Sequence, residues 1–141
     1  MEKEMARIVA VCLSEERGCS KKPVSQGTLR EDYGLVGDAH AGSDRQVSLL
    51  AVESINKMLA ALESINPERM RSQGVRIDPG DSAENLVTEG IDLTSLGLGT
   101  RIYIGEQVIL EITEIGKAVH NRIGKLRPLA GIYPILSVVK V

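Results

Sequence analysis

The sequence contains no phenylalanine or tryptophan, and tyrosine occurs only three times in 141 residues. So few aromatic rings provide no platform on which nucleic-acid bases stack. Basic and acidic side chains nearly balance, at 17 against 19, so the chain carries no general positive field. The composition therefore excludes a general nucleic-acid-binding protein, and any site for a small anionic ligand must be built from local charges.

Long apolar segments are also missing. No apolar run approaches the roughly 18 residues of a membrane span, and the first residues, Met-Glu-Lys-Glu-Met, lack the regions of a signal peptide. We therefore expect a cytoplasmic protein that makes no membrane contact.

Cysteine and histidine are scarce, with two of each. Cys12 and Cys19 are too few for a disulfide framework, so we expect free thiols. Cys12 lies in an apolar stretch and is expected to be buried, whereas Cys19 lies near three basic residues that favour a thiolate. Two histidines alone do not make a stable metal site, and none is predicted.

The chain length and its 43% hydrophobic content suit one domain spanning residues 1–141, with an aliphatic core. The Val- and Ile-rich stretch Arg7–Leu13 predicts a central strand buried on both faces, followed by a solvated loop at 15–22. Apolar residues at helical spacing predict one helix over 48–63, which Asn66 and Pro67 stop. Residues 69–80 are expected to be irregular.

From Thr100 onward the pattern alternates. Ile102 and Ile104 face one way, residues 108–115 continue the alternation, and Gly105-Glu106 predicts a hairpin turn between them. Residues 135–141 add a last strand. The sequence therefore predicts a mostly β, α+β fold with peripheral helices.

Three polar segments are candidates for a binding site. In the first, Gly37 and Gly42 bracket a loop that brings His40 near Arg45, an arrangement that suits an anion. Alternatively the glycines only shape a turn, Asp38 satisfies backbone donors and His40 packs at the surface. In the second, 80–86, Glu84 and Asn85 either bind a ligand or bond within their own loop. In the third, 111–122, the basic cluster either joins the same cleft or is a solvated face; it comprises Lys117, His120 and Arg122.

These three segments, in this order, resemble the MOSC domain, the module named after the C-terminal domain of molybdenum cofactor sulfurase. The resemblance runs from about Ala6 to Arg122 and implies a MOSC-type β-barrel with a cleft for molybdenum cofactor. The cofactor-binding residues it implies are His40, Arg45, Glu84, Asn85, Lys117, His120 and Arg122. It also implies a persulfide-carrying cysteine at the position of Val119, and many relatives have a second cysteine at Ile123.

The missing thiol separates three hypotheses. The first is a module that binds and handles molybdenum cofactor without persulfide chemistry, because Val119 cannot carry sulfur. The second is an enzyme: a sulfurtransferase with Cys19 as a displaced carrier, or a molybdenum-dependent reductase. The third is a scaffold with a degenerate cleft. The resemblance implies a cysteine desulfurase or a molybdoenzyme as partner, and pyridoxal phosphate would belong to that desulfurase.

Overall fold

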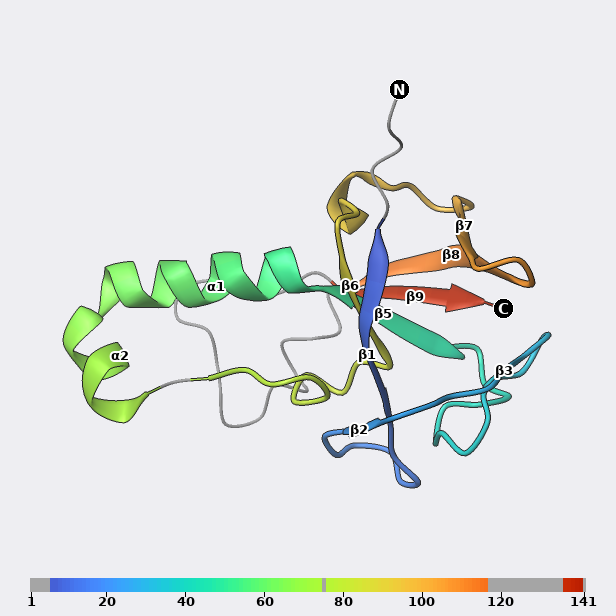
Figure 1. Ribbon diagram of the computed structural model, residues 1–141, viewed down its shortest axis with the longest axis horizontal. Helices are drawn as coiled ribbons and strands as arrows, with labels where there is room; N and C mark the ends of the chain where they lie inside the picture. Colours follow the sequence, from blue (N-terminus) through green and yellow to red (C-terminus); the bar gives the residue numbers. More distant parts are fainter. Residues whose placement is uncertain (1–5, 75, 117–135, 141) are drawn as a thin grey trace.

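The computed structural model describes residues 6–74, 76–116 and 136–140 of the chain (Figure 1). Within these ranges strands predominate and are accompanied by two α-helices, which confirms the predicted α+β class. The elements are β1 Arg7–Leu13, β2 Lys22–Val24, β3 Leu29–Arg30, β4 Gly34–Leu35, β5 Val47–Ala51, α1 Val52–Ile65, α2 Pro67–Gln73, β6 Leu86–Glu89, the 3₁₀ turn η1 Leu93–Ser95, β7 Arg101–Ile104, β8 Val108–Gly116 and β9 Leu136–Lys140.

Seven of the strands form one sheet in the order β2-β1-β6-β5-β9-β8-β7. β5 and β6 run parallel, and α1 and α2 form the crossover between them, whereas the other neighbours are antiparallel. β3 and β4 pair separately. Within the described ranges no pairing joins the two outer strands, β2 and β7, so the barrel implied by the resemblance is not detected as a closed one.

Strand β1 has the predicted bounds but not the predicted burial. Only Cys12 is buried along it, and Val9 is exposed where a bulge shifts the register against β6. The expectation of burial on both faces is wrong, because α1 packs mainly on β5, β6 and α2. Apolar residues of β1, among them Ile8 and Val11, instead pack against the core from one side.

The predicted helix begins later than expected. Residues 47–51 form β5, whose side chains are almost all buried, and α1 starts only at Val52. A continuous apolar run fits a buried strand and a helix equally well by periodicity, which explains the error. The predicted stop is confirmed, since Asn66 caps α1. Pro67, however, opens α2 at once, so the irregular segment predicted from residue 69 is partly helical.

The C-terminal predictions are confirmed. β7 and β8 pair as an antiparallel hairpin around Gly105, and β9 lies between β5 and β8. The core is built from residues of β5, β6 and β8 and includes Val47, Leu49, Leu86, Leu110 and Ile112. Within the described part of the chain, no helix has the length and apolar character that a membrane crossing requires.

Candidate functional site

The centre of the site is a buried lysine that sequence reasoning placed in a solvated loop. The Lys21 side chain is 1% exposed, and Nζ donates to Asp38 Oδ1 at 2.7 Å and to Ser14 Oγ at 3.2 Å. Nδ1 of His40 lies 3.3 Å from the same nitrogen. An ammonium has three protons, and here each has an acceptor, which is the arrangement that makes a buried charge tolerable.

Asp38 is the anion that balances this charge. Its carboxylate also accepts hydrogen bonds from the backbone N–H groups of Ser14 and His40. Burial by itself raises the pKa of Asp38, but the hydrogen bonds from Lys21 and the two N–H groups outweigh it and hold the pKa below the usual 3.8. Asp38 is therefore ionised at neutral pH and fixes the loop that follows it.

Lys21 also contacts the ring of His40. Because an ammonium can only donate, a hydrogen bond from Lys21 to Nδ1 requires the tautomer that carries its proton on Nε2. The carboxylate of Asp38 lies farther away, at 3.7 Å from Nδ1. Lys21 and Asp38 thus both lie beside Nδ1 of His40 and orient its ring.

The first and second segments meet at Lys21. The backbone N–H of Lys21 donates to the carbonyl oxygen of Gly80 at 2.9 Å. Gly80 has a φ of +91°, and a Cβ at this position would collide with the carbonyl oxygen of Lys21. Glycine is required here because no side chain fits so close an approach of two backbones. The loop containing His40 and the loop containing Glu84 are therefore held on one frame.

Asn85 binds three strands together. Its Oδ1 accepts from the backbone N–H of Ser48, and its Nδ2 donates to the carbonyl oxygen of Cys12. The backbone N–H of Asn85 bonds to Ser48 as well. These bonds connect the end of β1 to the starts of β5 and β6, which locates the loops described above.

Glu84 is fully buried, and no hydrogen-bond partner of either carboxylate oxygen is found among the described residues. Burial raises its pKa to about 7, with a small further rise from Asp81. The backbone N–H groups of Glu84, Gly80 and Ser82 lie close enough to lower the pKa in part. Among the described residues, however, none of them forms a hydrogen bond of good geometry with a carboxylate oxygen. A buried carboxyl without partners is unusual in a native protein and marks this position as one with a further role.

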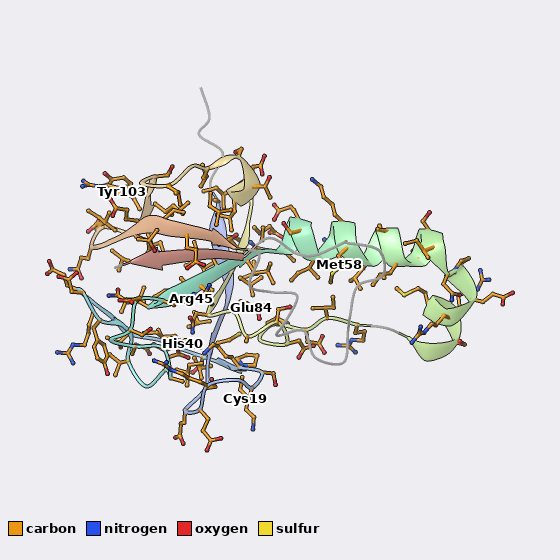
Figure 2. All side chains as sticks on the ribbon, turned by 180° about the vertical axis from the view of Figure 1, so that it is seen from behind. Cys19, His40, Arg45, Met58, Glu84 and Tyr103 are labelled. Carbon is orange, nitrogen blue, oxygen red and sulfur yellow. The ribbon has the colours of Figure 1, made fainter. Side chains whose placement is uncertain are left out.

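Arg45 connects the first segment to the third. Its Nε and Nη2 donate to both carboxylate oxygens of Glu114 on β8, at 3.2 and 2.5 Å. The Arg45 side chain remains 31% exposed, so it can reach a ligand from the surface. In Figure 2, Arg45, Glu84 and His40 occupy one region of the molecule. Four predicted positions lie outside the described residues, namely Lys117, Val119, His120 and Arg122.

The two thiols differ as expected. Cys12 is buried, and burial together with the charge of Glu84 raises its pKa to about 12, so it remains an inert thiol. Cys19 is exposed, and its Sγ lies 3.2 Å from the carbonyl oxygen of Glu16. Figure 2 shows Cys19 farther out than His40.

Sequence reasoning missed Lys21 as part of the site, whereas the expectation that Asp38 accepts from backbone donors is confirmed by its bonds to Ser14 and His40. The segment around Lys21 is charged and contains Gly18, which is typical of a solvated loop. The pairing of Lys21 with Asp38 depends on the fold, because 17 positions separate the two residues. Within the described ranges no group of three His, Cys, Asp or Glu side chains could hold a metal ion.

Comparisons with known proteins agree with this architecture. The structure resembles YuaD from Bacillus subtilis, with 23% identity and a TM-score of 0.63, over 99% of this chain and 90% of YuaD. It also resembles YiiM from Escherichia coli, with 17% identity and a TM-score of 0.57, over 94% of this chain but only 62% of YiiM. At these identities the likeness shows the fold alone.

A search of curated proteins gave no match. The family model of the MOSC domain matches residues 36–115, which is more than half of the chain and includes the first and second segments. The chain therefore belongs to the MOSC domain family.

Proposed function

We propose that this protein binds and handles molybdenum cofactor, or a related anionic pterin, where the three segments converge. Membership of the MOSC family supports a relation to molybdenum cofactor. The convergence itself carries the proposal: Lys21 joins the first segment to the second, and Arg45 joins the first to the third. These contacts join parts of three polar stretches that are distant in the sequence.

The residues present fit such a cofactor. Arg45 is a partly exposed guanidinium that matches an anionic group with two parallel N–H donors. His40 is oriented by Lys21 and adds a second polar contact. Glu84 is an uncommitted carboxyl with a pKa near neutrality, which suits the N–H-rich edge of a pterin. Its burial means that its cover must move before a ligand contacts it.

Asn85 has a supporting role in this proposal. Its amide oxygen and amide nitrogen already bond to Ser48 and Cys12, so it fixes the position of Glu84 rather than competing for a ligand. Lys117, His120 and Arg122 complete the proposed cofactor-binding set from the third segment. Bound molybdenum cofactor would supply redox chemistry and sulfur coordination that side chains lack.

The proposal excludes persulfide transfer through the family position, because Val119 has no thiol. The protein would then store, present or deliver the cofactor. Its partner in this scheme is a molybdoenzyme or a cysteine desulfurase, and pyridoxal phosphate would be bound only by the desulfurase.

The test is an anaerobic titration of the purified protein with molybdenum cofactor, followed by thermal unfolding. A ligand at 100 times its dissociation constant stabilises by roughly 2.7 kcal/mol. We expect a saturable shift for the wild type and a roughly 10- to 100-fold weaker affinity for Arg45→Ala, since hydrogen bonds to charged groups contribute about 1.5–3 kcal/mol.

Arg76→Ala is the matched control for this experiment. Arg76 is also an exposed arginine paired with a carboxylate, that of Asp78, but it lies outside the three joined loops. It should bind the cofactor like the wild type. Equal affinities of the Arg45→Ala and Arg76→Ala variants would reject the proposed site, and no shift in the wild type would reject the proposed ligand.

A further inference from the structure

A cavity lies at the opposite end of β1 from the site described above. It has a volume of about 540 Å³ and is lined by the start of β1, by η1 and its flanking residues, and by β7. β1 spans seven residues, which at about 3.3 Å per residue separates this cavity from Ser14 by roughly 20 Å. Figure 2 shows Tyr103, which lines the cavity, far from His40.

The cavity lies between the start of β1 and β7 of the open sheet. Ala6, Arg7 and Ile8 line one side and residues 100–105 line the other, although β1 and β7 are not paired. A closed barrel would fill this space with side chains of neighbouring strands. The hollow is partly open to solvent, so a ligand can enter it from the surface.

The lining is mainly aliphatic and incompletely packed. Two lining residues, Leu49 and Leu93, are buried in the core. Four others pack against that core but are only partly buried, namely Ile8, Leu96, Ile102 and Ile104. Volumes of 300–1,000 Å³ with apolar walls and few polar groups are typical of small-molecule sites. An apolar ligand in the cavity would bury the surface of these four side chains that is still exposed to solvent.

The charges around the cavity favour an anion. Its described lining includes two arginines and no acidic residue. Arg7 is neutralised by Glu89, whose Oε1 accepts from its Nε at 2.9 Å. Arg101 is exposed, and no ion pair is found between it and Glu111, the residue opposite it on β8, or any other described residue. One positive charge therefore stands at the edge of an apolar hollow.

We propose that this cavity binds a small carboxylate amphiphile, a molecule of the medium-chain fatty-acid type. The apolar chain lies against Ile8, Leu96 and Ile102, and the carboxylate pairs with Arg101 at the surface. This site is independent of the proposed cofactor cleft, because it shares no lining residue with the loops that carry His40 and Arg45.

Isothermal titration of the full chain with sodium decanoate, below the concentration at which it aggregates, tests the proposal. We expect saturable binding at one site, and weaker binding of decan-1-ol, which has the same chain without the charge. Arg101→Gln should weaken decanoate binding roughly two- to fivefold, as expected for an exposed ion pair. Ala6→Phe, which places a ring at the mouth of the cavity, should abolish most of the binding.

Two controls separate this site from other sources of binding. Arg71→Gln removes an exposed arginine from α2, remote from β7 (Figure 1), and should leave decanoate affinity unchanged. Arg45→Ala should also leave it unchanged, so failure of the cofactor proposal does not alter this result.

Three outcomes would overturn the inference: no saturable decanoate binding by the wild type, equal affinity for decanol and decanoate, or the same affinity for Arg101→Gln and Arg71→Gln. If Ala6→Phe fails to fold, the Arg101→Gln comparison still decides the matter, because Arg101 is exposed.

Discussion

Lys21 Nζ lies 2.7 Å from Asp38 Oδ1, and the two side chains are 1% and 0% exposed. This buried ion pair joins the end of the loop after β1 to the first motif segment. Serine, histidine and backbone groups complete the hydrogen bonds of both partners. The pair therefore fixes the geometry of the site, and each of its members can be tested separately.

Replacing Lys21 with methionine should destabilise the fold strongly. The variant leaves the carboxylate of Asp38 buried without its cation, for which a loss of about 3–5 kcal/mol in the free energy of unfolding is expected. Urea unfolding measures this loss. Lys22→Met is the matched control, because Lys22 is the exposed neighbour, and its change should stay within about 0.5 kcal/mol. Equal stability of the two variants would show that the pair does not support the fold.

The ring proton of His40 should reside on Nε2. Nitrogen NMR of the imidazole distinguishes the two tautomers, and a His120→Gln background leaves His40 as the single histidine signal. We expect an unprotonated Nδ1 at neutral pH, and a loss of this preference in a Lys21→Met protein that is still folded. A proton found on Nδ1 in the wild type would contradict the contact with the lysine ammonium.

Glu84 should make stability fall as the pH rises. Its pKa is raised from 4.5 to about 7 by burial, so between these values the unfolded chain releases a proton that the folded chain retains. The contribution of Glu84 to the free energy of unfolding is greatest below pH 4.5 and falls by roughly 3 kcal/mol as the pH rises to about 7. Glu84→Gln should remove the decline.

The measurement is the difference in unfolding free energy between the wild type and Glu84→Gln at pH 5 and pH 8. Taking the difference cancels the pH dependence that the two proteins share. Parallel curves across this range would mean that the carboxyl of Glu84 is solvated.

Gly80→Ala should lower the free energy of unfolding by more than backbone strain alone explains. The new Cβ would collide with the carbonyl oxygen of Lys21, and φ at this position is +91°. Gly99→Ala is the matched control, because Gly99 has a similar φ of +82° but open space around it. We expect about 1 kcal/mol for Gly99→Ala, the strain of a left-handed residue, and several kcal/mol for Gly80→Ala. Equal thermal unfolding shifts would contradict the close approach of the two loops.

Much of the fold follows from local pattern. Alternation predicts the β7–β8 hairpin, Asn66 and Pro67 end α1, and the apolar stretch Arg7–Leu13 predicts β1 with its bounds. These features depend on residues close together in the chain. The start of α1 could not be predicted, because β5 and the helix share one apolar run whose division is decided by burial in the sheet.

The sequence by itself determined the family, the polar segments and the absence of a thiol at Val119, because these are properties of residue type and order. Only the tertiary structure decided that Lys21 is buried, that Arg45 pairs with Glu114, and that the carboxylate oxygens of Glu84 are buried with no hydrogen-bond partner among the described residues. Each of these depends on contacts between residues 17 or more positions apart, or on burial by several strands at once. Local sequence carries no signal for such contacts, since pairing and desolvation arise only when the sheet assembles.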